Sequence, residues 1–138
     1  MKVAVIGSGG REHAICVSLK QSKKVKKIYC IPGNAGTNLI AENIEINIDN
    51  FEEIKDFSLE NKIDLIIVGP EKPLVNGIVD YLKDFNIKTF GPNKIASKLE
   101  GSKIFTKNLC KQYNIPTAKF GIFENKDKAL NFLKDCDF

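Results

Sequence analysis

Hydrophobic residues in the first part of the chain follow two alternating patterns. Short runs of mainly β-branched residues end at glycine or proline, which is typical of buried parallel strands. Between these runs, apolar residues recur at the spacing of one helix face. The predicted strands are residues 2–6, 27–32, 44–48, 63–68 and 88–90, and the predicted helices are residues 11–21, 51–58 and 73–85.

The order of these elements predicts the fold class. Strand and helix alternate through about residue 92, as in an open, doubly wound α/β sheet of parallel strands with a Rossmann-like fold. Right-handed crossovers then give the strand order 3-2-1-4-5. Asn50 is a suitable N-cap for the helix that follows it, because its side chain can accept a backbone hydrogen bond.

The pattern changes after residue 92. Helical segments at residues 93–99 and 102–113 follow one another closely, then residues 118–123 resemble a strand and residues 127–133 a helix. This last part is too short to close a hydrophobic core of its own. We therefore expect one complete domain over residues 1–101 and the opening of a second over residues 102–138.

Composition and charge exclude several classes of protein. The chain has 138 residues with a formal net charge of +4, and its lysines are spread without interleaved aromatic residues, which disfavours a nucleic-acid partner. No apolar run approaches the ~18 residues of a membrane span, and the N-terminus lacks signal-peptide features, so we expect a cytoplasmic protein with no membrane partner. The four cysteines lack metal-ligand spacing and are expected to be reduced thiols.

Candidate chemistry lies in three glycine-containing segments, each directly after a predicted strand. They are residues 7–13, 32–37 and 69–74. In an open α/β sheet, ligands bind beyond the carboxyl ends of the strands, where the strand order reverses. The predicted order puts the first and third segments beside each other and the second next to the first.

The first segment turns from a strand into a helix N-terminus, where glycines and free backbone amides favour an anion. Arg11, the only arginine of the chain, can form a bidentate contact with phosphate that lysine cannot form. The plain alternative is a tight turn with a surface arginine. The candidate phosphate-binding residues are Gly7, Ser8, Gly9, Gly10, Arg11, Glu12 and His13.

Neighbouring residues favour a phosphosugar over a dinucleotide. Glu12 occupies the third glycine position of the dinucleotide motif, and no carboxylate ends the second strand. Asn34 and Thr37 can bind hydroxyl or amide groups, while Glu71 either suits a ribose hydroxyl or an amine, or is a solvated loop acid. Lys103, which opens another helix, either contacts a nucleotide phosphate or belongs to a capped surface helix. A stand-alone Rossmann-like nucleotide-binding module is the alternative function.

Together, these motifs resemble those of the phosphoribosylamine–glycine ligase family of purine biosynthesis, within the ATP-grasp superfamily. The resemblance rests on GSGGREHA at residues 7–14, PGNAGT at residues 32–37 and VGPEKPL at residues 68–74. Further matching positions, in the family's order, are Gly77, Asp80 and residues 91–92, 99–103 and 105–118.

The resemblance implies a pre-ATP-grasp domain followed by the start of an ATP-grasp domain. The family joins glycine to 5-phosphoribosylamine with ATP and Mg²⁺, through glycyl phosphate. The first segment would lie near the phosphoribosyl phosphate, Glu71 near the ribose or its amine, and Lys103 near an ATP phosphate. Metal ligands belong to family regions that do not occur in these residues, so the chain alone should lack ligase activity, and its oligomeric state is not indicated. The implied substrate-binding set also includes Gly33, Asn34, Gly36, Thr37, Pro70 and Asp80.

Overall fold

The computed structural model describes residues 1–134 and residue 136. The chain divides into two compact units, Met1–Gly101 and Ser102–Phe138, which we call the first and second units. The first unit contains the three glycine segments, and the second contains Lys103.

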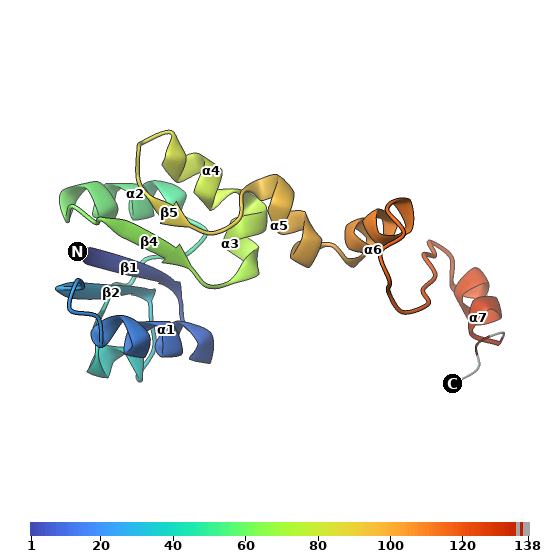
Figure 1. Ribbon diagram of the computed structural model, residues 1–138, viewed down its shortest axis with the longest axis horizontal. Helices are drawn as coiled ribbons and strands as arrows, with labels where there is room; N and C mark the ends of the chain where they lie inside the picture. Colours follow the sequence, from blue (N-terminus) through green and yellow to red (C-terminus); the bar gives the residue numbers. More distant parts are fainter. Residues whose placement is uncertain (135, 137–138) are drawn as a thin grey trace. The chain divides into compact units, whose positions relative to one another are not determined.

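A five-stranded sheet forms the centre of the first unit, and all its neighbouring strands run parallel (Figure 1). The strand order is β3-β2-β1-β4-β5, which confirms the predicted fold class and order. The order reverses between β1 and β4, so the carboxyl ends of these two strands mark the expected ligand edge. The strands are β1 (Lys2–Gly7), β2 (Lys27–Pro32), β3 (Glu42–Asn43), β4 (Leu65–Val68) and β5 (Thr89–Phe90).

Helices cover both faces of this sheet, with α1 on the side opposite α2 and α4 (Figure 1). Cys16 of α1 packs with Val5 and Cys30 in a small buried cluster. Ile54 of α2 and Ile78 of α4 belong to a larger buried cluster. The helices are α1 (Gly10–Lys20), the 3₁₀ turn η1 (Thr37–Leu39), α2 (Phe51–Glu60), α3 (Glu71–Asn76), α4 (Ile78–Lys83) and α5 (Lys94–Gly101).

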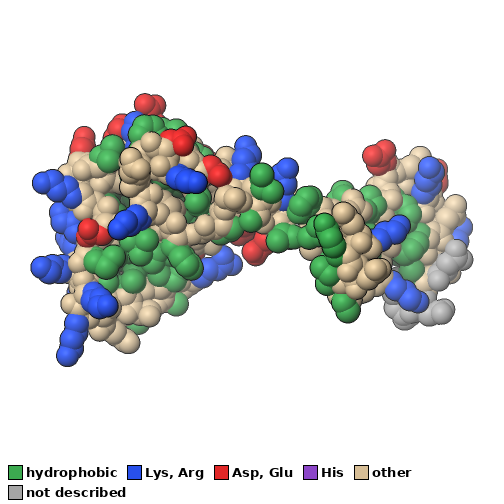
Figure 2. All heavy atoms as spheres, turned by 45° about the horizontal axis from the view of Figure 1, so that its top comes forward, with side chains coloured by type: hydrophobic (Ala, Val, Ile, Leu, Met, Phe, Trp, Pro, Cys, Tyr) green, Lys and Arg blue, Asp and Glu red, His purple; other side chains and the backbone are tan. Residues whose placement is uncertain are grey.

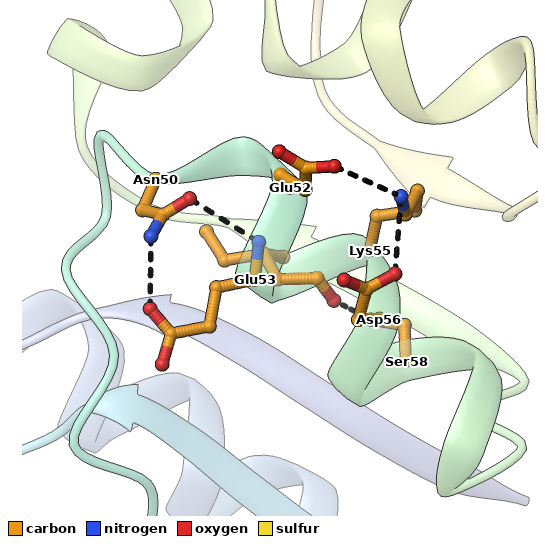
Figure 3. Close-up of polar contacts among 7 residues, drawn as sticks. Asn50, Glu52, Glu53, Lys55, Asp56 and Ser58 are labelled. Atoms are coloured by element: carbon orange, nitrogen blue, oxygen red, sulfur yellow. Dashed lines mark hydrogen bonds and ion pairs between the residues drawn. The ribbon is translucent and has the colours of Figure 1, made fainter.

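Asn50 caps the N-terminus of α2, as the sequence predicts (Figure 3). Its Oδ1 accepts a hydrogen bond from the Glu53 amide at 3.2 Å, and its Nδ2 donates to Glu53 Oε2 at 2.9 Å. On the next turn, Lys55 Nζ lies 3.0 Å from Asp56 Oδ1. The start of α2 is therefore fixed by local contacts that need no distant partner.

Residues 44–48 do not form the predicted strand. The ladder ends where the Ile44 amide donates to the Cys30 carbonyl at 2.9 Å, and the Ile46 amide turns back to the Ile44 carbonyl at 2.8 Å. Ile46 is buried, and Ile44 and Ile48 pack against the same cluster. The isoleucines therefore alternate because their side chains pack against the core, and not because the segment pairs with another strand.

The predicted helix over residues 73–85 is divided into α3 and α4. Gly77 separates them with a φ of 98°, in the left-handed region that favours glycine. Its amide lies 3.0 Å from both the Pro73 and Leu74 carbonyls, which closes the last turn of α3. The chain can thus change direction while Leu74 and Ile78 stay in one core.

The second unit contains α6 (Lys103–Gln112) and α7 (Lys126–Lys134), and neither helix has a buried residue. Hydrophobic side chains lie at its surface (Figure 2). Residues 118–123 were predicted as a strand, and the structure has none there, because the described part of this unit offers no strand to pair with. None of the helices within the described residues has the length and apolar character that a membrane crossing requires.

Candidate functional site

Three loops meet at the carboxyl ends of β1, β2 and β4, as the strand order predicts. We call them loop 1 (residues 7–10), loop 2 (residues 33–37) and loop 3 (residues 69–71). Arg11 Nη1 donates to the Gly69 carbonyl of loop 3 at 2.7 Å. From loop 2, Asn34 Nδ2 donates to the Ser8 carbonyl of loop 1 at 2.8 Å. Side-chain hydrogen bonds thus connect loop 1 to both of its neighbours.

Glu12 lies inside this junction. Its side chain is 5% exposed, and Oε2 accepts a hydrogen bond from the Gly9 amide at 2.6 Å. A Cβ on Gly7 would lie 2.7 Å from Glu12 Cδ, and one on Gly69 would overlap the same carboxylate. These glycines therefore make room for Glu12, whose carboxylate caps helix α1. In this structure the Glu12 carboxylate and the Gly9 amide are thus paired with each other, and their predicted ligand-binding roles stay predictions.

The next positions of loop 1 are open. A Cβ on Gly10 would meet no atom within 4 Å. The amides of Gly10 and Arg11 lie in the first turn of α1, where a helix provides no acceptor. Arg11 is exposed and keeps further guanidinium donors beside the one used by Gly69. His13 is partly buried close to Gly36, whereas Ser8, like Gly10 and Arg11, is exposed, and the phosphate-binding role of these residues stays a prediction.

Loop 2 uses its polar side chains internally. Thr37 is fully buried, and its Oγ1 accepts from the Asn34 amide at 2.7 Å. Asn34 Oδ1 in turn accepts from the Thr37 amide at 3.0 Å. Asn43, on β3, adds a bond from Nδ2 to the Asn34 carbonyl at 2.8 Å. Thr37 therefore helps to form the loop, and its predicted ligand-binding role stays a prediction. Sequence reasoning missed Asn43, whose only signal is a polar residue near a predicted strand.

Loop 3 leads into α3 with Pro70 at the N-cap position. Glu71, the first residue of α3, is exposed and forms no hydrogen bond or ion pair among the described residues. Asp80 has a structural partner instead, because its Oδ2 accepts from the Lys94 amide at 2.7 Å and caps α5. Asp80 thus binds the start of α5, whereas the Glu71 side chain is exposed, and the ligand-binding roles of both residues stay predictions.

Beneath loop 1 lie two buried thiols, Cys16 and Cys30. The thiol of Cys30 donates to the Gly7 carbonyl at 3.5 Å. Hydrogen bonding with Cys30, followed by burial, raises the pKa of Cys16 well above the ordinary thiol value. Cys16 is therefore held as the neutral thiol at neutral pH, consistent with the expectation of reduced cysteines.

The second unit contributes Lys103, exposed at the start of α6, where Ser102 Oγ accepts from the Phe105 amide at 3.3 Å. It also has an open groove of about 840 Å³, lined in part by Lys111, Thr117 and Phe120. No group of three His, Cys, Asp or Glu residues able to hold a metal ion occurs in residues 1–134 and 136.

The sequence that forms the three loops matches a known protein family. A family model described as "Phosphoribosylglycinamide synthetase, N domain" matches residues 1–100. The chain belongs to this family. The match covers β1 to β5 and all three loops, so the resemblance found in the motifs is confirmed.

Members of the family are longer than this chain. A phosphoribosylamine–glycine ligase from Caldanaerobacter subterraneus subsp. tengcongensis is 53% identical over 135 residues, 98% of this chain and 32% of the relative. One from Clostridium acetobutylicum is 47% identical over 138 residues, 100% of this chain and 33% of the relative. The crystal structure of the Thermotoga maritima phosphoribosylamine–glycine ligase has a TM-score of 0.71 at 28% identity, over 99% of this chain and 31% of that one. The chain thus spans about a third of the length of these relatives.

Proposed function

We propose that this chain is the 5-phosphoribosylamine-side domain of an ATP-dependent ligase that joins glycine to 5-phosphoribosylamine, giving glycinamide ribonucleotide, ADP and phosphate. The family match over residues 1–100 and the names of the relatives support this reaction. The observation that carries the site is Arg11, an exposed guanidinium held against loop 3 beside the open surface of Gly10.

In this proposal, the phosphoribosyl phosphate binds to the Gly10 and Arg11 amides and to the guanidinium. Two features support the placement: these amides have no helical acceptor, and the dipole of α1 favours an anion there. The Glu12 carboxylate already uses the Gly9 amide, so the positive charge of Arg11 must offset the repulsion between this carboxylate and a phosphate. Glu71, across the loop junction, would accept a hydrogen bond from a ribose hydroxyl or from the amine.

The nucleotide part of the reaction is assigned to the second unit and to the regions that the longer relatives have beyond it. Lys103, exposed at the start of α6, would contact an ATP phosphate. We assign the Mg²⁺ ligands to those same regions, so no step is assigned to the metal here. We expect the 138-residue chain to bind the phosphosugar without catalysing ligation. Its partners are then small molecules, with no nucleic acid or membrane, and we place the reaction in the cytoplasm.

Calorimetric titration of the 138-residue chain with ribose 5-phosphate tests this proposal. Arg11→Ala should weaken binding by roughly 10- to 100-fold, because a charge-assisted hydrogen bond contributes about 1.5–3 kcal/mol. Lys83→Ala, which removes an exposed cation from the end of α4, is the matched control and should bind like the unmodified chain. Equal affinity in the Arg11 variant would contradict the proposal. Tight binding of NAD without binding of ribose 5-phosphate would favour the nucleotide-binding module instead.

A further inference from the structure

Asn43 lies at the edge of the sheet, as the second and last residue of β3. We propose that it is a positioning residue for the phosphosugar site: its side chain holds loop 2 in the shape that lets Asn34 reach loop 1. This inference rests on the proposed function, because it takes loop 1 to be the place where phosphate binds. The side-chain hydrogen bonds of Asn43 go to loop 2, and the role needs no contact with a ligand.

The hydrogen bonds of Asn43 fix the orientation of its amide. Nδ2 donates to the Asn34 carbonyl at 2.8 Å, and this carbonyl also accepts from the Asn38 amide at 3.1 Å, so both of its lone pairs are used. Thr37 Oγ1 already accepts from the Asn34 amide at 2.7 Å, and it lies 2.8 Å from Asn43 Oδ1. The Thr37 hydroxyl is also within 2.9 Å of the Asn34 carbonyl, but Asn43 Nδ2 and the Asn38 amide already donate to that carbonyl, which favours Asn43 Oδ1 as the acceptor of the Thr37 proton. Asn43 serves as both donor and acceptor in a saturated network.

Packing inside loop 2 adds a steric requirement for this amide. Gly33 has a φ of 78°, and a Cβ there would overlap Asn43 Oδ1 and Cγ. The Asn43 side chain thus fills the space that glycine leaves at the start of the loop. Any residue at position 43 must therefore match a small planar space that has a carbonyl on one side and a hydroxyl on the other.

Asn34 transmits this constraint to loop 1. Its backbone is held by Asn43 and Thr37, and its side-chain Nδ2 donates to the Ser8 carbonyl at 2.8 Å and approaches the Gly9 carbonyl at 3.3 Å. From the opposite side, Glu12 binds the Gly9 amide. The peptide groups that precede the Gly10 and Arg11 amides are therefore fixed through Asn34, and Asn34 is fixed through Asn43.

Asn43→Asp tests the donor role of Nδ2. The introduced carboxylate places an oxygen where Nδ2 donated to the Asn34 carbonyl, so this hydrogen bond is lost and the two oxygens repel each other. The affinity for ribose 5-phosphate should therefore fall about tenfold. Asn38→Ala, in the same segment and exposed, keeps its backbone amide and should bind normally.

Asn43→Ala is the variant that folds most readily, because the Thr37 hydroxyl can turn to the Asn34 carbonyl 2.9 Å away. A double-mutant cycle with Asn34→Ala then tests the route. If Asn43 acts through Asn34, the two losses of affinity should be clearly less than additive. Additive losses, or Asn43 variants that bind like the unmodified chain, would overturn the inference. Absence of ribose 5-phosphate binding in the unmodified chain would instead refute the proposed function.

Discussion

The buried carboxylate of Glu12 provides the sharpest test of how loop 1 is built. Glu12→Ala removes the acceptor of the Gly9 amide and leaves a space between Gly7 and Gly69. Glu12→Gln keeps the shape and an acceptor oxygen but removes the charge. Comparing the two substitutions separates packing from the charge-assisted hydrogen bond.

The structure allows the size of both effects to be worked out. A hydrogen bond to a charged group contributes about 1.5–3 kcal/mol, and burial of one methylene adds about 0.8 kcal/mol. Because Gly9 is exposed, water can replace part of the lost bond, so we expect Glu12→Ala to lower the free energy of unfolding by about 2–3 kcal/mol. Glu12→Gln loses the interaction of the charge with the N-terminus of α1 and part of the bond strength, about 1 kcal/mol.

Urea denaturation followed by far-ultraviolet circular dichroism measures these differences in the 138-residue chain. The midpoint should fall in the order unmodified, Glu12→Gln, Glu12→Ala, with little change in the slope of the transition. Glu45→Ala is the matched control, because Glu45 is exposed and should change stability by less than about 0.5 kcal/mol. A Glu12→Gln chain as stable as the unmodified one would refute the contribution of the charge, and a Glu12→Ala chain as stable as the unmodified one would refute the capping role.

Two further measurements test the capping of α2 and the buried thiol. Asn50→Ala should lower the free energy of unfolding by about 1 kcal/mol, whereas Asn50→Ser should lower it by only a few tenths, and equal losses would contradict the cap. Because folding raises the pKa of Cys16, this thiol stabilises the folded chain fully at pH values below the ordinary thiol pKa of about 8.5. Its contribution to the free energy of unfolding falls as the pH rises above that value. Between pH values of about 8 and 10, the free energy of unfolding should fall less in Cys16→Ala than in the unmodified chain, whereas Cys110→Ala should behave like the unmodified chain. An equal fall in Cys16→Ala and in the unmodified chain would refute the assignment.

Much of the fold could be predicted because its signals are local. The runs that became β1 and β2 are buried on both faces, and Asn50 carries its capping chemistry in its own side chain. The strand prediction for residues 44–48 is wrong because alternation of apolar and polar residues indicates which side chains are buried. It does not indicate whether the backbone amides have a partner strand. The break at Gly77 was missed because glycine is permitted in a helix, and only the surrounding packing selects the left-handed conformation.

The site was predictable to the level of the loops but not of the side chains within them. Strand order alone brings loops 1, 2 and 3 together, since parallel strands end at a common edge. The sequence does not indicate that Gly69 lies against Glu12, because this contact joins residues far apart in the chain. Asn43 was missed for another reason: its partners are near in the chain, but the loop conformation that brings them together has no sequence signal.

The polar side chains that have structural partners in the loops share one physical reason for them. Loops beyond a sheet edge leave backbone amides and carbonyls without ladder partners, and buried groups of this kind require hydrogen bonds. Acidic, hydroxyl and amide side chains meet that need as readily as they bind ligands, so residue type cannot separate the two roles. Burial separates them: Thr37 is 0% exposed and Glu12 is 5% exposed, whereas Arg11 and Glu71 are exposed. We therefore expect Arg11, Glu71 and the Gly10 backbone to contact the ligand. The buried side chains of Thr37 and Glu12 would hold the loops that position these groups.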